Sequence, residues 1–388
     1  MAEVNTRKRG NKWEYYFEAA SVDGKRKRIS KSGFATKKEA LKSGIQSMAE
    51  YENTGKVMFN SEISLADFLD MWLTERCSVV NNPLTYDTYS DYLNYSIKPN
   101  IGKYKLSNIT YATIQSFVNE RHEYGWKTST IKRCTAILSS AFKWAIKNDY
   151  IKSNPIFGIE YPKDEVVDDE ELSYTQDQMN EFFNAYKDNQ LIYTILMIGY
   201  HCGLRISETL GLTWEDIDFE NKTMSINKQL QWTKSKGKHI CKPKYDSCRT
   251  IDLDDNIIKY LCELKQNQTE NEDARLYRYY LDDDNRVIKT TAPIKNYIDF
   301  VAIKENGKKD DRRNLAVWLC RQRKNGKPVF GTHALRHTHC TRMIQNGVNL
   351  KYVQQRLGHK DIDVTLRIYN HLNKDGRISE INKLNSLF

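Results

Sequence analysis

Residues 333–372 read HALRHTHCTRMIQNGVNLKYVQQRLGHKDIDVTLRIYNHL, and the rest of the chain can be interpreted outward from this stretch. His333 and Arg336 stand three positions apart at its start. Positions i and i+3 share one face of a helix, so the imidazole and the guanidinium are expected to point to the same place.

A second helix with a defined end is expected further along. Leu350, Val353 and Leu357 recur at helical spacing, and Gly358 directly after them suits the left-handed residue that closes a helix. His359 should therefore lie just beyond a helix end, on a fixed corner of the backbone.

A short third helix should carry Tyr369. Asp361 or Asp363 can cap it, and Ile362, Leu366 and Tyr369 recur at helical spacing. Two His, one Arg and one Tyr on neighbouring turns suggest a site for an anion and a nucleophile.

Two further cations upstream would complete such a site. A phosphodiester under attack gathers negative charge on its non-bridging oxygens, and a pair of Arg side chains is suited to hold it. Arg205 follows the apolar run 191–200, which predicts a buried helix, so it is expected at a fixed helix-to-helix turn. The leaving alkoxide needs a proton donor, and a Lys in a hairpin between two strands could supply it. Lys242 and Lys244 are the candidates.

The order of these residues resembles the active site of the tyrosine recombinases, the family of phage-lambda-type integrases. In sequence order the six matching residues are Arg205, Lys244, His333, Arg336, His359 and Tyr369. The flanking sequence motifs match as well: Gly-Leu-Arg-Ile-Ser-Glu, His-Ala-Leu-Arg-His-Thr, and Leu-Gly-His with a Tyr ten residues after the His. The resemblance covers nearly the whole chain and is greatest for integrases of conjugative transposons and temperate phages.

Lys244 resembles the family's Lys more closely than Lys242 does. It stands ahead of a Ser-x-Arg strand, here Ser247 and Arg249. The family often has Thr directly after this Lys, whereas this chain has Tyr245. Lys242 therefore stays an alternative general acid.

The resemblance implies a role for each residue type in two transesterifications. The Tyr would attack a DNA phosphate, forming a 3′-phosphotyrosine and releasing a 5′-hydroxyl. Both Arg would neutralise the non-bridging oxygens, the first His would assist proton transfer with the Tyr, and the second His would hydrogen-bond the phosphate. The Lys would protonate the leaving 5′-oxygen. Two Arg and a Lys make a metal unnecessary, and because the bond energy stays in the protein–DNA link, no ATP or other cofactor is expected.

The implied function is that of a site-specific DNA recombinase, an integrase that integrates and excises a mobile genetic element such as a transposon through a Holliday junction. The implied partners are double-stranded DNA, at core and arm sites, and further copies of the chain in a homotetramer on DNA. Whether an excisionase and a host DNA-bending protein take part is left open. We expect the protein in the bacterial cytoplasm, associated with the nucleoid when it acts.

Residues 1–56 are predicted to form a three-stranded sheet backed by one helix. They hold thirteen Lys or Arg against seven Asp or Glu. Trp13, Tyr15 and Phe17 alternate like a strand with one buried face, and residues 22–25 signal a hairpin. Such a basic sheet can enter a major groove, with DNA contacts expected from Arg26, Arg28 and Lys31. The resemblance implies an arm-type DNA-binding domain; the alternative is a solubilising appendage.

Residues 63–160 are predicted to form a helical domain. Helices are expected from Ser64 onward and over residues 86–97, 110–122 and 128–148. The start of the last helix offers hydroxyls and cations suited to phosphate contacts: Thr128, Ser129, Thr130, Lys132 and Arg133. The resemblance implies a core-binding domain, and the alternative is a plain helical bundle.

Residues 173–388 are predicted to form a mixed α+β catalytic domain, mainly helical with a small sheet, after a linker over 158–172. Residues 270–330 give no clear assignment. The tail carries an apolar stripe of Ile378, Ile381, Leu384 and Leu387 on one short helix. This tail helix can dock on its own domain or, as the resemblance implies, on the next protomer of a ring.

Composition sets limits on the function. The formal net charge of +10 is consistent with a polyanionic partner, and no apolar run approaches the roughly 20 residues of a membrane span. Eight scattered Cys favour reduced thiols over a disulfide framework. His337, His339 and Cys340 match no common zinc spacing.

Two other functions share part of the pattern. A type IB topoisomerase-like nicking and closing enzyme uses the same Tyr chemistry but needs neither an arm domain nor a tail that contacts partners. A non-catalytic DNA-binding regulator would not need the complete set of six residues.

Overall fold

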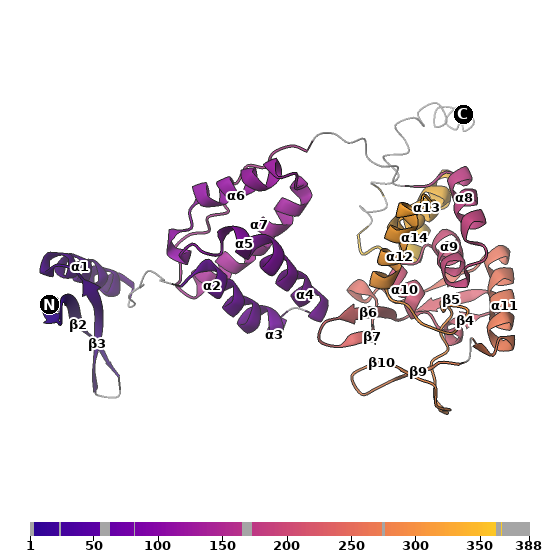
Figure 1. Cartoon of the computed structure of the whole chain (residues 1–388), viewed down its shortest axis with the longest axis horizontal. Coiled ribbons are helices and arrows are strands. Elements are labelled where there is room, and N and C mark those ends of the chain that lie inside the picture. The colour runs from indigo at the N-terminus through magenta and orange to yellow at the C-terminus, as the bar shows by residue number, and fades with distance from the viewer. Residues whose placement is uncertain are drawn as a thin grey trace. The chain divides into compact units, whose positions relative to one another are not determined.

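A computed structural model of the chain describes residues 4–22, 25–54, 63–80, 82–164, 173–273, 276–361 and 366. The chain divides into two compact units, Met1–Glu165 and Val166–Phe388 (Figure 1). The predicted fold class, mainly α with small sheets, is confirmed.

An antiparallel three-stranded sheet opens the first unit. Its strands are β1 (Asn5–Arg9), β2 (Lys12–Val22) and β3 (Lys25–Phe34), in that spatial order, and α1 (Lys37–Thr54) follows. Tyr15 and Phe17 alternate along β2 and are buried, as is Ala40 of α1. The Glu39 amide donates to Thr36 Oγ1 (3.2 Å) and the Thr36 amide to Glu39 Oε2 (3.3 Å), a capping box that fixes the start of α1. The predicted sheet and helix are confirmed.

Helices form the rest of the first unit. They are α2 (Leu65–Trp72), η1 (Leu73–Cys77), α3 (Ser78–Val80), α4 (Pro83–Asp91), η2 (Tyr92–Ile97), α5 (Lys98–Ile101), η3 (Leu106–Asn108), α6 (Tyr111–Glu123) and α7 (Thr128–Lys147). Phe68, Trp72, Phe117 and Phe142 are almost fully buried in a common apolar core. Ser64 accepts from the Asp67 amide (3.0 Å), so α2 begins at the predicted place.

The start of the predicted linker, residues 158–172, packs on this helical core. Gln115 bonds to both backbone groups of Glu160 (2.9 and 3.0 Å), and the Tyr161 hydroxyl lies 2.7 Å from Thr135 Oγ1. The chain is therefore held against α6 and α7 beyond the point where a free linker was expected to begin.

The second unit combines seven α-helices with three small sheets among its described residues. The helices are α8 (Gln176–Tyr186), α9 (Gln190–Cys202), α10 (Ile206–Gly211), α11 (Asp255–Glu270), α12 (Arg312–Lys324), α13 (Thr332–Gln345) and α14 (Leu350–Leu357), with short 3-10 turns η4 (Trp214–Asp216) and η5 (Lys244–Asp246). The sheets are β4–β5–β8 (Ile217–Asp218, Thr223–Ile226, Arg249–Asp252), the hairpin β6–β7 (Gln229–Thr233, Gly237–Cys241) and the hairpin β9–β10 (Arg278–Leu281, Val287–Thr290).

Helix α9 packs against α8, α10, α11 and α13. Nine of its residues are buried, as the apolar run in the sequence predicted. A Cβ at Gly199 would lie 2.9 Å from Leu335 Cδ1, so the absence of a side chain there lets α13 approach α9 closely.

The segment 270–330, which the sequence left unassigned, contains the β9–β10 hairpin and α12. Its anchor is Tyr279, which is buried, donates to the Gly307 carbonyl (3.0 Å) and accepts from the Lys309 amide (2.8 Å). The Lys309 ammonium is buried over the Phe300 ring, 4.3 Å from its centroid. Tyr279 and Phe300 therefore serve in packing, whereas Tyr280 and Tyr297 of the same segment are exposed.

Candidate active site

Arg205 lies at the turn between α9 and α10. Gly203 ends α9 in the left-handed conformation (φ 65°), and a Cβ there would lie 2.6 Å from His339 Cδ2 and 2.9 Å from Leu357 Cδ2. Only glycine fits such a contact without displacement of α13 and α14. Arg205 follows as the N-terminal cap of α10, so the predicted fixed helix-to-helix turn is confirmed.

Arg336 lies on α13 and is almost completely buried. It donates from Nη1 to the Gly203 carbonyl (2.8 Å) and from Nη2 to the Leu357 carbonyl. These carbonyls belong to the ends of α9 and α14, where a cation is favoured. Burial, reinforced by the charge of Arg205, lowers the pKa of Arg336 to about 9.

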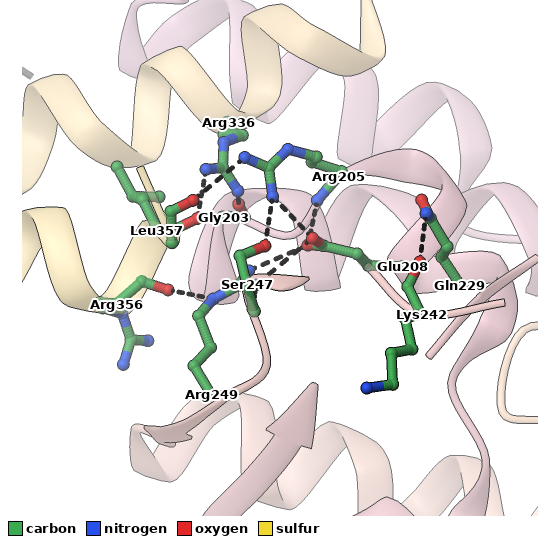
Figure 2. Close-up of polar contacts among 11 residues, drawn as sticks. Gly203, Arg205, Glu208, Gln229, Lys242, Ser247, Arg249, Arg336, Arg356 and Leu357 are labelled. Atoms are coloured by element: carbon green, nitrogen blue, oxygen red, sulfur yellow. Dashed lines mark hydrogen bonds and ion pairs between the residues drawn. The ribbon is translucent and has the colours of Figure 1, made fainter. Parts of the chain in front are cut away.

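Glu208 is a buried carboxylate shared by two guanidinium groups (Figure 2). Its Oε1 accepts from Arg205 Nη1 (2.8 Å) and Arg249 Nη1 (3.3 Å), and its Oε2 accepts from the Arg205 amide (3.0 Å) and Arg249 Nη2 (2.9 Å). Burial alone would raise the pKa of Glu208, but the bonds and charges of both Arg lower it to about 2.

His359 lies on the corner that the sequence predicted. Gly358 closes α14 with φ 65°, and the His359 amide donates to the Gln354 carbonyl (3.1 Å). The Gly358 carbonyl accepts from Arg205 Nη2 (3.2 Å), which ties this corner to the α9–α10 turn. Burial and the charges of Arg336 and Arg205 lower the pKa of His359 to about 3, so its imidazole is neutral at pH 7.

Four of the predicted residues line one pocket of about 440 Å³. The pocket residues are Arg205, Tyr245, His333, Arg336, His337, Cys340, Leu357, His359, Lys360 and Asp361. Burial lowers the pKa of both His333 and His337, with the charge of Arg312 next in effect on His333 and that of Arg336 on His337. These imidazoles are therefore uncharged at neutral pH and able to accept a proton, beside two guanidinium groups that can hold an anion.

The two candidate lysines do not line this pocket. Lys244 begins the short turn η5, and its Nζ lies 5.0 Å from the centroid of the Tyr245 ring. Lys242 pairs with Asp246 at 3.5 Å, and both side chains are largely exposed. The strands expected on either side, β5 with Met224 and Ile226 and β8 with Ile251, do pair antiparallel, but the hairpin β6–β7 is inserted between them ahead of the lysines.

Tyr245, His337, Glu208 and Arg249 belong to the site but were not proposed as functional residues. Glu208 and Arg249 stood within quoted motifs, and a buried carboxylate three positions after Arg205 could have been read as its partner. Tyr245 has φ 63° and a largely exposed ring on the pocket, a conformation that no sequence pattern indicates.

Tyr369 lies outside the described residues, as do Ile378, Ile381, Leu384 and Leu387 of the predicted tail helix. Of the predicted helix that should carry Tyr369, only Leu366 is described, and it is helical. The position of the expected nucleophile relative to the pocket therefore stays a prediction.

The candidate DNA contacts of the sheet are divided between its faces. Arg28 and Arg7 flank the Tyr16 ring, at 5.2 and 5.5 Å from its centroid. Lys31 pairs in register with Tyr15, whose side chain is on the buried face, so Lys31 does not share the face of Arg28. The Arg26 side chain lies outside the described residues.

At the start of α7, Thr128 is engaged within the protein. Its amide donates to both carboxylate oxygens of Asp164 (2.8 and 3.1 Å), and its hydroxyl donates to the Pro162 carbonyl (2.9 Å). Lys132 lies over the Tyr161 ring at 5.3 Å, and Arg133 lies over the Tyr92 ring at 6.0 Å. Ser129 is exposed, and Thr130 is half-buried.

Neither a metal-binding cluster nor a membrane-spanning helix occurs in the described part of the chain. No group of three or more His, Cys, Asp or Glu is placed there to hold a metal ion. None of the described helices is both long and apolar enough to cross a membrane.

Comparisons with known proteins match the chain in three parts. The sequence profile of the phage integrase family matches residues 173–375. The N-terminal SAM-like domain of phage integrases matches residues 64–122, and an arm DNA-binding domain matches residues 3–44.

One similar protein and two solved structures span most of the chain. A tyrosine recombinase XerC-like protein of Caldanaerobacter subterraneus subsp. tengcongensis is 29% identical, with 97% of each chain covered. The Tn1549 transposon integrase in complex with a circular intermediate DNA has a TM-score of 0.64 at 22% identity and covers 83% of this chain and 99% of its own. The lambda integrase tetramer bound to a Holliday junction has a TM-score of 0.58 at 17% identity, with 92% and 94% covered. The two structures share the fold.

Proposed function

The chain belongs to the phage integrase family, and from this we propose that it is a tyrosine-type site-specific recombinase that integrates and excises a mobile genetic element. It cuts one strand of double-stranded DNA by transesterification, and the broken end is held as a 3′-phosphotyrosine. A 5′-hydroxyl from the partner duplex then attacks this link, and two such exchanges pass through a Holliday junction.

The observation that carries the proposal is the convergence of four distant residues on one pocket. Arg205, His333, Arg336 and His359 line it together, and the two guanidinium groups are each fixed by backbone carbonyls or a buried carboxylate. Donors held in place before the reaction stabilise developing charge without reorganisation, which is worth roughly 2.7–4 kcal/mol for one donor in comparable sites.

We assign the remaining steps to three residues. Tyr369 is the nucleophile: its oxygen bonds to phosphorus as the bond to the 5′-oxygen breaks. The guanidinium groups of Arg205 and Arg336 form the phosphate clamp. His333, uncharged and beside this clamp, takes the phenolic proton. Lys244 returns a proton to the 5′-oxygen; it lies over Tyr245, a pocket residue, and a change of this turn would bring its ammonium to the leaving group.

The other parts of the chain are proposed to bind DNA and partner copies. Residues 1–56 form the arm-type DNA-binding domain, residues 63–160 the core-binding domain, and residues 173–388 the catalytic domain with a tail helix. The lambda integrase tetramer supports a homotetramer on DNA, and the Tn1549 integrase complex with a circular intermediate DNA supports a DNA substrate. An excisionase and a host DNA-bending protein are proposed accessory partners, and the bacterial nucleoid is the proposed place of action.

A nicked suicide substrate that carries an end of the element tests this function. Purified protein should form a covalent complex with the DNA, lost in Tyr369→Phe, and should transfer the strand to a partner duplex. Arg205→Ala should lower the cleavage rate about 100-fold or more while DNA binding is retained. Relaxation of supercoiled DNA without strand transfer would instead indicate a topoisomerase-like enzyme, and binding without a covalent complex would indicate a regulator.

A further inference from the structure

Arg249 is the first residue of β8, and the chemistry proposed above gives it no task. Its side chain is 7% exposed, yet it lies directly beneath the phosphate clamp (Figure 2). All three nitrogen atoms of its guanidinium group donate hydrogen bonds. Nη1 donates to the nearby Ser247 carbonyl (3.1 Å), and the other acceptors come from two different parts of the unit.

The first part is the turn that carries Arg205. Arg249 Nη2 and Nη1 donate to the two oxygens of Glu208, at 2.9 and 3.3 Å. Arg205 bonds to the same two oxygens, through its amide and its Nη1. The Glu208 carboxylate thus accepts four hydrogen bonds, two from Arg205 and two from Arg249.

The second part is the end of α14, which leads to His359. Arg249 Nε donates to the Arg356 carbonyl at 2.7 Å. The side chain also fills the space under Gly358, where a Cβ would lie 3.1 Å from Arg249 Nη1. A cation at a helix C-terminus interacts favourably with the exposed carbonyls of the last turn.

The shared carboxylate has an electrostatic consequence. Arg205, Arg249 and Arg336 carry three positive charges and Glu208 one negative charge, which leaves a net +2 around the clamp. Without Arg249 the net charge would fall to +1, and Glu208 would be free to pair with Arg205 alone. A carboxylate paired with one Arg would draw the Arg205 guanidinium toward itself and away from a phosphate.

We propose that Arg249 is a positioning residue for the cleavage reaction, which holds the Arg205 clamp and the His359 corner in one rigid unit and keeps Glu208 from neutralising Arg205. This inference rests on the proposed function. A Lys cannot replace it, since a single ammonium cannot reach both Glu208 oxygens and the Arg356 carbonyl in the way that a planar guanidinium does.

The test compares cleavage of two suicide substrates by Arg249→Gln, Arg249→Lys and the wild type. One substrate has a normal phosphate at the cleavage position, and the other has a methylphosphonate, in which a methyl group replaces one non-bridging oxygen and removes the negative charge. We expect both variants to cleave the phosphate about tenfold or more slowly than the wild type, because a misplaced clamp stabilises the charge poorly. On the neutral substrate each should cleave within about threefold of the wild type, because little charge is left to stabilise.

Arg356→Lys is the matched control. Arg356 is also largely buried and lies at the same helix end, but it bonds to the Asp252 and His201 carbonyls and to His339, not to Glu208. This substitution should lower the cleavage rates of both substrates by the same factor. All rates are taken in single turnovers at a temperature where circular dichroism shows each variant folded, and Arg249→Lys serves if Arg249→Gln does not fold.

The outcomes separate this inference from the proposed function. If the wild type cleaves and the Arg249 variants are slowed equally on both substrates, Arg249 is merely structural and the positioning role is overturned. Wild-type rates in both variants would overturn it too. If the wild type forms no covalent complex with the phosphate substrate, the proposed function itself fails.

Discussion

Burial and the charge of Arg205 oppose the positive charge of Arg336, although two helix-end carbonyls accept hydrogen bonds from it. It is buried, its pKa falls to about 9, and the positive charge of Arg205 is one of the causes. A phosphate in the pocket would attract both guanidinium groups and offset the repulsion between them. The pocket is therefore organised for a bound anion rather than for the stability of the free protein.

His339 gives a testable pH dependence at the level of one residue. Its Nδ1 lies 2.7 Å from the Tyr200 carbonyl and its Nε2 accepts from Arg356 (3.1 Å), which requires the neutral imidazole with its proton on Nδ1. Burial, with the charge of Arg356, lowers its pKa to about 3. A lowered pKa means that below pH 6.5 the unfolded chain binds a proton that the folded protein does not. The free energy of unfolding therefore decreases as the pH is lowered.

We expect this His to remove up to about 2 kcal/mol of stability between pH 7 and pH 5. His339→Gln should flatten that part of the curve, because the amide does not titrate in this range. Urea unfolding of both proteins at each pH measures the difference. Equal slopes for the two proteins would contradict the buried neutral state of His339.

The residues of the site could largely be predicted where spacing and local motif agreed. Residues whose contacts come from segments distant in sequence could not. The His333–Arg336 pair follows from helical periodicity, and the corner at His359 follows from the glycine before it. The bonds of Arg249 could not be foreseen, because they join segments that are distant in sequence. Lys31 is different: it stands three positions after Arg28, and an odd separation in a strand already predicts opposite faces.

The junction of α9, α13 and α14 at Gly203 yields a prediction at the level of elements. Gly203→Ala combines a left-handed backbone with a Cβ 2.6 Å from His339, so it should destabilise the second unit by about 2 kcal/mol or more. Gly326→Ala is a matched control, because Gly326 has φ 69° but nothing within 4 Å of a Cβ.

Gly326→Ala should lower the free energy of unfolding by about 1 kcal/mol, because only the left-handed backbone is strained there. Denaturant midpoints of the three proteins give the comparison. If both variants lost the same stability, the close packing at Gly203 would not contribute.

Most helices could be predicted from sequence, but the hairpins β6–β7 and β9–β10 could not. Capping residues and apolar spacing gave α1, α2, α9 and α14, and the His333–Arg336 spacing gave α13, since these signals are local. The strands β5 and β8 enclose Lys244 in the sequence and pair as expected, but the hairpin β6–β7 inserted between them was not foreseen. The β9–β10 hairpin escaped prediction because its strands are short and held by Tyr279 and its neighbours.

At the scale of the whole molecule, the clamp lies in the second unit and most candidate DNA contacts lie in the first. Deletion of residues 1–56 should therefore remove binding to distal arm sites while the cleavage rate at the core site is unchanged. Fewer phosphate contacts should also make the dependence of DNA affinity on salt concentration less steep. Footprinting and single-turnover cleavage measure the two effects, and an intact distal footprint after the deletion would contradict the arm assignment.

The two carbonyls that hold Arg336 come from Gly203 and Leu357, which are 133 and 21 residues away in the chain. A polypeptide still leaving the ribosome therefore lacks one support of the clamp until α14 has emerged and folded. We therefore expect a chain truncated before α14 to lack a complete Arg336 site and to be inactive in cleavage.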